Sequence, residues 1–365
     1  MKTNGFFLSI LVFLLPAVGF SQLTSIDSSY LFIKKIHVTP VKNQYKSNTC
    51  WSFAALSMIE SEIQRMGKGT YDLSEMFVVR HSLINKGLKY VRLHGKLNFS
   101  GGGEFNDVMD VVRRYGIVPE EIYSGKNIGY DNHVHEEMQE VLKSYLDGVV
   151  RNRDDKLSPV WDEGYELVIN TYLGHVPAKF EYKGIHYTPE SFAKSTGINV
   201  DNYILLTSFT HHPYYSKFIL ELPDNWSWES YYNLPLDELM KIVDHSINEG
   251  YTVAWAGDIS ENFYSWDDAH ADFKFTSTDM NQIVQQRQVG FDNYETTDDH
   301  GMLICGIAKN KDGNEYYYMK NSWGTGNACN GFIYVSKSYF QYKTIAVMVN
   351  KEILPKDIAS KLGLR

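Results

Sequence analysis

Residues 40–54 read PVKNQYKSNTCWSFA, a polar segment that leads into an apolar pattern of helical period. From Cys50 onward, apolar residues recur at three- and four-residue steps and Gly67 follows as a stop signal, so we predict a helix over residues 50–66. Cys50 would open that helix, where unpaired backbone N–H groups and the positive end of the helix dipole favour a thiolate. We therefore expect a nucleophile at Cys50, although an isolated cysteine is more often an inert buried residue.

A predicted β-hairpin in the C-terminal third supplies a candidate base. Apolar and aromatic runs at residues 301–308 and 315–320 are joined by a polar loop with Asp312-Gly313, which is a strong hairpin signal. His300 precedes the first strand and Asn321 follows the second, so both would lie at the open end of the hairpin. Asn321 would then accept from one ring N–H of His300 and fix its tautomer, while the other ring nitrogen faces a nucleophile.

Gln44 lies six residues before Cys50 in the same stretch. Its side-chain amide can donate to the same oxyanion as the backbone N–H of Cys50. A lone glutamine means little, so this interpretation depends on the residues around it.

The remaining pattern divides the chain by type of secondary structure. We predict helices over residues 107–115 and 235–248, and strands over residues 251–255 and 332–335. The N-terminal part is thus mainly helical and the C-terminal part mainly sheet. Residues of about 125–235 are interpreted as a loop-rich, aromatic insertion, because no linker composition brackets them.

The strings around these residues resemble the active-site segments of the papain superfamily of cysteine peptidases. In that superfamily a Gln stands at this spacing before the nucleophile, a Trp follows the nucleophile, and later segments carry the His and the Asn. The matching strings are PVKNQ–x5–CWSFA at residues 40–54, DHGMLICGI at residues 299–307 and YMKNSWG at residues 318–324. The resemblance implies that Cys50 is the nucleophile, His300 the base and Asn321 the residue that orients the base.

The same resemblance implies further roles. Gln44 would help to bind the oxyanion, and Trp323 would shield the His–Asn pair. Gly102 and Gly103, in a run of three glycines, resemble the pair whose backbone binds an extended peptide. Peptides are the implied substrates, and the chemistry needs no cofactor. A transglutaminase-like or amidase enzyme is a rival, but its third member would usually be Asp.

Within the superfamily, the chain resembles the bleomycin hydrolase and aminopeptidase C branch. The strings that carry this resemblance lie at residues 170–192, 211–215, 234–260 and 345–362. They imply an α+β, papain-like, two-lobed fold. Its parts would be a helical lobe at about 40–125, the insertion, and a strand-rich, β-barrel-like lobe at about 250–350. Homo-oligomer formation is a further expectation.

The branch also carries a C-terminal arm that enters the cleft and makes its members aminopeptidases. Here only Leu362-Gly363-Leu364-Arg365 ends the chain after IASK, so we expect a shortened arm. An endopeptidase with an open cleft is therefore an alternative to an aminopeptidase. A catalytically silent peptide-binding member is another, but it would lack at least one of the four catalytic residues.

The first residues predict an export signal. Lys2 supplies a positive charge, residues 6–20 form an apolar run, and Gly19 and Ser21 are small residues where a signal peptidase cleaves. We expect a signal peptide at residues 1–21 and a periplasmic or secreted mature protein, with an uncleaved anchor as the alternative.

Composition excludes several functions. The formal net charge is −9 and no basic run occurs, so we expect no nucleic-acid partner, and no membrane association after signal cleavage. Neither His211-His212 nor Asp298-Asp299 has the spacing of a zinc site, so we expect no metal. With three cysteines, at most one disulfide can form, between Cys305 and Cys329.

Overall fold

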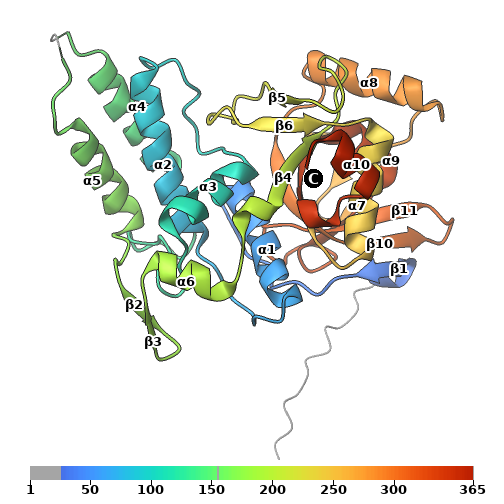
Figure 1. Cartoon of the computed structure of the whole chain (residues 1–365), viewed down its shortest axis with the longest axis horizontal. Coiled ribbons are helices and arrows are strands. Elements are labelled where there is room, and N and C mark those ends of the chain that lie inside the picture. Colours follow the sequence, from blue (N-terminus) through green and yellow to red (C-terminus); the bar gives the residue numbers. More distant parts are fainter. Residues whose placement is uncertain (1–25, 154–155, 365) are drawn as a thin grey trace, which may run out of the picture.

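The computed structural model describes residues 26–153 and 156–364, and the predicted signal peptide lies outside these residues (Figure 1). Within them, no helix combines the length and the apolar character needed to cross a membrane. The α-helices are α1 (Cys50–Arg65), α2 (Glu75–Arg92), α3 (Phe105–Tyr115), α4 (Glu136–Val150), α5 (Trp161–Leu173), α6 (Pro189–Thr196), α7 (Leu236–Asn248), α8 (Met280–Asp292), α9 (Lys337–Lys343) and α10 (Lys356–Lys361).

The strands fall into one large sheet and one small hairpin. The hairpin consists of β2 (Phe180–Tyr182) and β3 (Ile185–Tyr187). The large sheet contains β1 (Tyr30–Lys35), β4 (Tyr203–Thr207), β5 (Lys217–Ile219), β6 (Ser230–Asn233), β7 (Val253–Gly257), β8 (Tyr264–Ser265), β9 (His270–Ala271), β10 (His300–Asn310), β11 (Glu315–Lys320), β12 (Phe332–Ser336) and β13 (Thr344–Asn350). The predicted α+β class is therefore confirmed, as are the helices α1, α3 and α7 and the hairpin of β10 and β11.

The large sheet is mixed and mostly antiparallel. Its order is β5-β6-β4-β13-β7-β10-β11-β12-β9-β8, with parallel pairing only for β4 with β6 and for β12 with β9 among the described strands. The N-terminal strand β1 pairs with the second half of β10, and β7 pairs with its first half. The order has two ends, β5 and β8, so these strands do not close into a barrel.

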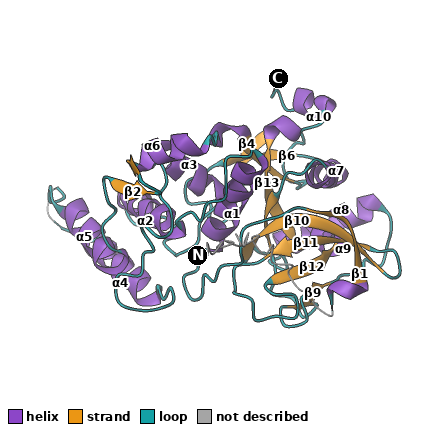
Figure 2. Ribbon diagram, turned by 90° about the horizontal axis from the view of Figure 1, so that it is seen from below, coloured by secondary structure: helices purple, strands orange, loops and turns teal. Residues whose placement is uncertain are grey.

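The helices α2 to α6 and the large sheet occupy opposite sides of the molecule, with α1 between them, whereas α7 to α10 lie on the side of the sheet (Figure 2). Residues Leu56, Ile59 and Ile63 of α1 are fully buried, which fits the helical period seen in the sequence. The hydroxyl of Ser74 caps α2 by accepting from the backbone N–H of Phe77 at 3.0 Å. The central helix thus contacts both lobes and carries Cys50 at its first position.

The prediction of a loop-rich segment at residues 125–235 is wrong. Its first part folds as the helices α4 and α5, and its last part adds β4, β5 and β6 to one end of the large sheet. In α4 only Met138, Leu142 and Leu146 are buried, one per turn. Such a narrow apolar stripe gives only a weak helical pattern in the sequence, so the pattern does not predict this helix.

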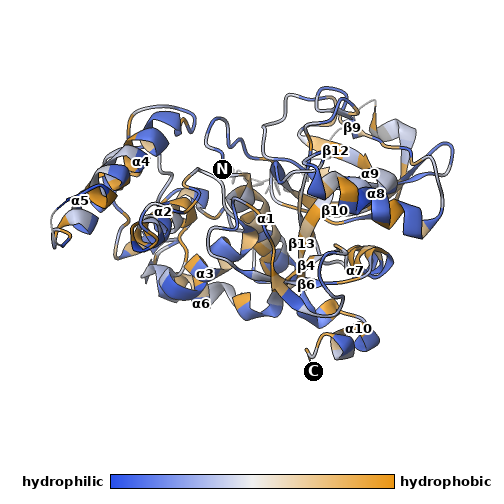
Figure 3. Cartoon of the chain, turned by 90° about the horizontal axis from the view of Figure 1, so that it is seen from above, coloured by the Kyte–Doolittle hydropathy of each residue, from blue (hydrophilic) through white to orange (hydrophobic). Residues whose placement is uncertain are grey.

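The two lobes have separate hydrophobic cores. The larger core lies among the helices, and a second one lies between the sheet and α7. Figure 3 shows hydrophobic residues concentrated on β10 and β13, the strands at the centre of the sheet. Cys305 and Cys329 are buried thiols in a small third core, where Cys305 Sγ donates to the carbonyl of Tyr318 at 3.4 Å.

Candidate active site

A cavity of about 550 Å³ opens where α1 meets β10. Six of the residues singled out in the sequence line it: Gln44, Cys50, Gly102, Gly103, His300 and Trp323. The seventh, Asn321, lies behind the cavity wall and contacts His300. The fold therefore brings together residues that are spread over most of the chain.

The His300–Asn321 pair has a defined hydrogen-bond direction. Nε2 of His300 lies 2.6 Å from Oδ1 of Asn321, and the same oxygen accepts from the backbone N–H of Ser322 at 2.7 Å. The backbone N–H of Ser322 can only donate, so the atom that it contacts is the amide oxygen. An amide oxygen can only accept, and Nε2 of His300 therefore carries the hydrogen. In the neutral ring, Nδ1 then holds the free lone pair.

Aromatic rings cover this pair. The indole of Trp323 packs on the imidazole of His300 with 4.6 Å between centroids, and Trp266 and Tyr264 pack on the indole in turn. Burial lowers the pKa of His300 to about 4, although the hydrogen bond to Asn321 opposes this shift. The ring is therefore neutral at physiological pH and can accept a proton.

Cys50 is half-buried at the start of α1. Burial raises the pKa of its thiol to about 12, while hydrogen bonds from the backbone N–H groups of Gly301 and Trp51 lower it. The N–H donors at the helix start thus act in the predicted direction, towards the thiolate, and burial acts against them. Deprotonation of Cys50 thus requires a base in the same cavity.

Gln44 is held with its amide nitrogen available. Its backbone N–H donates to the carbonyl of Ser322 at 2.8 Å, and its Oε1 accepts from the Ser322 hydroxyl at 2.6 Å. This hydrogen bond fixes which end of the amide faces the protein. Among the described residues, none accepts a hydrogen bond from Nε2, so this donor is free to bind an anion in the cavity.

The glycine run at residues 101–103 leaves no room for side chains. A Cβ on Gly101 would lie 2.1 Å from Gln139 Nε2, and a Cβ on Gly102 would lie 1.8 Å from Asp224 Oδ2. From α2, the buried Nζ of Lys86 donates to the carbonyls of Ser100 at 3.1 Å and Gly102 at 2.5 Å. The segment is thus fixed from two sides at the edge of the cavity.

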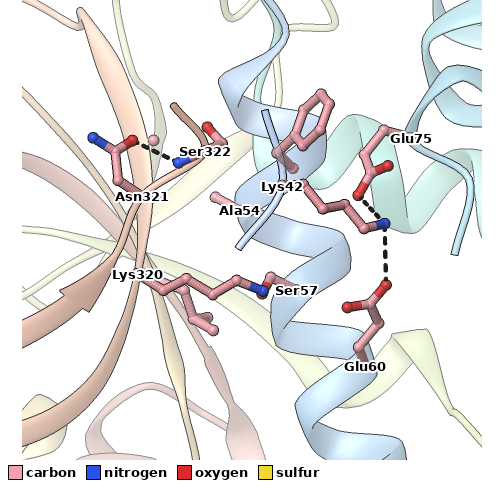
Figure 4. Close-up of a pocket in the computed structure, with 11 residues that line it drawn as sticks. Lys42, Ala54, Ser57, Glu60, Glu75, Lys320, Asn321 and Ser322 are labelled. Atoms are coloured by element: carbon pink, nitrogen blue, oxygen red, sulfur yellow. Dashed lines mark hydrogen bonds and ion pairs between the residues drawn. The ribbon is translucent and has the colours of Figure 1, made fainter. Parts of the chain in front are cut away.

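A buried charge network behind the site was missed in the sequence (Figure 4). Nζ of Lys42 lies 2.7 Å from Glu75 Oε1 and 3.4 Å from Glu60 Oε1, while Nζ of Lys320 donates to the hydroxyl of Ser57 at 2.7 Å. Lys42 lies two positions before Gln44, and Lys320 lies one position before Asn321. The network therefore attaches both active-site segments to α1 and α2. The available signal was a lysine inside each motif.

Acidic residues also line the cavity, and they too were missed as site residues. They are Glu104, Asp224, Asp298 and Asp299. In the sequence, Asp298 and Asp299 suggest at most a metal site, but in the structure the two carboxylates face different partners. Asp299 accepts from the Thr297 hydroxyl at 2.6 Å, whereas Asp298 hydrogen-bonds the carboxyl of Glu104.

His211 and His212 do meet a carboxylate, that of Glu221, at 3.2 and 2.9 Å from their Nε2 atoms. However, Nε2 of Gln288 donates to Nδ1 of His211 at 3.1 Å, and its Oε1 accepts from the backbone N–H of Thr210. His211 Nδ1 is thus an acceptor, and its Nε2 carries a hydrogen directed at Glu221. This nitrogen presents no lone pair to a cation, so the cluster is a hydrogen-bonded one.

The two-lobed α+β fold, with a thiol and an imidazole in one cleft, defines a papain-like cysteine peptidase. A family model described as the Peptidase C1-like family matches residues 88–363, and the chain belongs to this family. The match includes His300 and Asn321 and begins after Cys50.

The chain is similar over most of its length to curated relatives. It is 23% identical to Aminopeptidase C of Lactobacillus helveticus, covering 92% of this chain and 84% of that protein. It is 21% identical to Bleomycin hydrolase of Gallus gallus, covering 87% of this chain and 82% of that protein. The crystal structure of PepW from Lactobacillus rhamnosis HN001 matches with a TM-score of 0.74 and 20% identity, covering 94% of this chain and 87% of that one. The predicted family and its bleomycin hydrolase and aminopeptidase C branch are therefore confirmed, and the chain is a hydrolase of the cysteine peptidase class.

Proposed function

We propose that the protein hydrolyses peptide bonds through Cys50, His300 and Asn321, with Gln44 as an oxyanion donor. The observation that carries the proposal is the direction of the His300–Asn321 hydrogen bond. It leaves Nδ1 of a neutral imidazole as a proton acceptor in the cavity that contains the Cys50 thiol.

The first half of the reaction forms an acyl-enzyme. His300 Nδ1 takes the proton of Cys50 as Sγ attacks the scissile carbonyl carbon, and the carbonyl oxygen becomes an oxyanion. Gln44 Nε2 and the Cys50 backbone N–H donate to that oxygen. The carbon–nitrogen bond then breaks, and the imidazolium gives its proton to the leaving amine.

The second half restores the enzyme. Water attacks the thioester and transfers one proton to His300, and the carbon–sulfur bond breaks. The proton returns to the thiolate of Cys50, and the acid product leaves. Burial opposes the first proton transfer, because it raises the pKa of the Cys50 thiol and lowers the pKa of the His300 imidazole, and it favours the return of the proton to sulfur at the end of the cycle.

Mass spectrometry of defined peptides tests the proposal. Purified protein should cleave peptides, and Cys50→Ala should abolish the cleavage while Cys329→Ala, which changes a thiol outside the cavity, keeps it. An epoxide thiol reagent should modify Cys50 with loss of activity. Cleavage that persists in Cys50→Ala would refute the assignment.

The relatives named Aminopeptidase C support removal of N-terminal residues as the specific reaction. An open-cleft endopeptidase is the second candidate, and the position of the described C-terminal residues favours it. In α10, Lys361 pairs with Glu238 of α7 at 2.7 Å, and Leu362 packs in the core beside α7. None of residues 351–364 lines the cavity.

We also propose that the protein acts after export. The support is the sequence of residues 1–21, in which a lysine precedes an apolar run and small residues follow. Mass measurement of the protein isolated from its own cells should give a mature chain that begins at Gln22. A full-length chain retained with the cells would contradict the proposal.

A further inference from the structure

The acidic wall of the cavity comprises Asp224, Asp298 and Glu104. They come from three distant segments: the loop between β5 and β6, the segment before β10, and the start of α3. The wall has no role in the reaction steps proposed above. Removing carboxylates from water costs free energy, so the presence of this wall needs a separate explanation.

Asp224 is positioned over the glycine run. Its Oδ1 accepts from Nδ2 of Asn98 at 2.8 Å and from the hydroxyl of Ser100 at 2.9 Å. Its Oδ2 lies over Gly102, closely enough that a Cβ there would be 1.8 Å away. Among the described residues, none donates a hydrogen bond to this second oxygen. The fold thus orients one carboxylate oxygen and leaves the other for a ligand.

Glu104 and Asp298 form a carboxyl pair. Glu104 is 2% exposed, and the hydroxyl of Tyr231 donates to its Oε2 at 3.1 Å. Its Oε1 receives no hydrogen bond from the described part of the chain. Burial raises the pKa of both groups, and their mutual interaction raises the pKa of Glu104 further and lowers that of Asp298. Asp298 is therefore the member of the pair that ionises more readily.

Within the described part of the chain, the wall has no ion-paired cation. No described lysine, arginine or histidine forms an ion pair with Asp224, Asp298 or Glu104. Lys86 is a buried lysine near the wall whose charge acts on Asp224 and Glu104, but its Nζ donates to backbone carbonyls under the glycine run and not to a carboxylate. Carboxylates that are partly withdrawn from water are usually paired with a cation, and no described side chain forms such an ion pair with Asp224 or Asp298.

The wall is also close to the nucleophile. The charges of Asp298 and Asp224 both raise the pKa of the Cys50 thiol. A cation bound between these carboxylates would cancel much of that effect and ease the transfer of the thiol proton to His300. A substrate of the right charge would then improve its own turnover as well as its binding.

We infer that the cleft selects peptides with a cationic group next to the scissile bond, and that Asp224 and Asp298 bind this group. The inference rests on the proposed peptidase function and specifies its substrates. The cation is either the α-ammonium group of a substrate whose N-terminus lies close to the scissile bond, or the side chain of a Lys or Arg residue of the substrate. The first source would make the protein an exopeptidase without any contribution from the C-terminal residues.

A small substrate set distinguishes the two sources. Dipeptide coumarylamides with alanine at one position and lysine or norleucine at the other would be compared, each with a free and an acetylated N-terminus. Norleucine keeps the aliphatic chain of lysine and removes its charge. We expect kcat/KM of at least one singly cationic form to exceed that of the acetylated norleucine form by tenfold or more.

Three variants assign the effect to residues. Asp224→Asn and Asp298→Asn keep the shape of the side chains, and each should reduce the cationic preference to about threefold or less. Glu229→Gln removes a charge from the same surface loop as Asp224 but outside the cavity, and it should keep the wild-type preference. The wild-type ratio itself requires no variant, so a variant that fails to fold does not remove the test.

Different results would contradict the cationic preference and the proposed peptidase function. Cleavage that depends on Cys50 but shows equal kcat/KM for cationic and neutral substrates would overturn the inference and leave the proposed function intact. Absence of Cys50-dependent cleavage of every substrate would overturn the proposed function. A cationic preference that survives in both aspartate variants would also overturn the assignment of the binding residues.

Discussion

The oxygen of the Asn321 amide accepts from the His300 ring and from the backbone of Ser322. Loss of this amide would allow the imidazole to rotate and to exchange tautomers, whereas loss of the imidazole removes the proton carrier itself. We expect Asn321→Ala to lower kcat by roughly 10- to 100-fold with little change in KM, and His300→Ala to lower it by more than about 1,000-fold.

Steady-state kinetics on one cleaved peptide would check this order. Asn314→Ala, in the exposed turn of the same hairpin, is the matched control and should retain wild-type kcat. If Asn321→Ala matched the wild type while circular dichroism showed an intact fold, the orienting role would be refuted.

Asp298 makes the cationic preference depend on pH. Burial, together with the charges of Asp224 and Asp299, raises its pKa to about 7, and the Glu104 hydrogen bond limits the rise. The group is therefore mostly neutral at pH 6 and mostly negative at pH 8, so a lysine substrate should bind better at the higher pH. Lysine itself stays charged over this range, because its pKa is about 10.4.

The measurement is the ratio of kcat/KM for acetylated lysine and norleucine substrates between pH 6 and pH 8. We expect this ratio to rise by about threefold to tenfold, and to stay flat in Asp298→Asn. A ratio that falls with pH would contradict the direction of the pKa shift.

The predicted site residues and the missed ones differ in how far their signal extends along the chain. Gln44 and Cys50 share one short string, and Asn321 is joined to His300 by a single hairpin, so local patterns sufficed to place them. Asp224 is brought to Gly102 only by the tertiary fold, across more than 100 residues. No periodicity marks such a contact.

At the scale of elements, α2 supports the glycine run through one buried side chain. Lys86→Met would remove the donors to the carbonyls of Ser100 and Gly102 while keeping the aliphatic bulk. Two buried acceptors would lose their partner, which should cost about 1–3 kcal/mol of stability. We also expect KM for peptides to rise severalfold, because the segment that would bind them is less firmly held.

Thermal unfolding and steady-state kinetics together would test Lys86→Met. The control is Lys89→Met, which removes a lysine one turn further along α2, where Nζ donates to the carbonyl of Ser227 and packs on Trp228. It should leave KM unchanged. An equal rise of KM in both variants would point to general loosening of α2 instead.

Elements of the helical lobe were also predicted unevenly, for a physical reason. The helix α1 is surrounded by protein, so its apolar pattern is broad and strong. In α5 only Tyr165, Ile169, Asn170 and Leu173 are buried, and the helix packs on α2 through a tyrosine that fits over Gly87. A helix held by so few contacts depends on its neighbour rather than on its own sequence pattern.

At the scale of the whole molecule, the described C-terminal residues lie against α7 and away from the cavity. Deletion of residues 363–365 keeps Lys361, which pairs with Glu238, and the core residue Leu362. We therefore expect kcat/KM for all substrates, and the ratio for free and acetylated forms, to stay within about twofold of the wild type. Release of endopeptidase activity by the deletion would instead assign the C-terminal residues a role in the cleft.

The pairing of β1 with β10 has a consequence for biosynthesis. The first strand of the sheet must wait for a partner made about 270 residues later, and the ribosome adds roughly 5–20 residues per second. During that interval, of the order of 15–50 s, the emerging chain contains Cys50 but not His300, the base that we propose. A nascent or prematurely terminated chain that stops before residue 300 would thus lack the proposed base, and the proposed cleavage could begin only when synthesis is nearly complete.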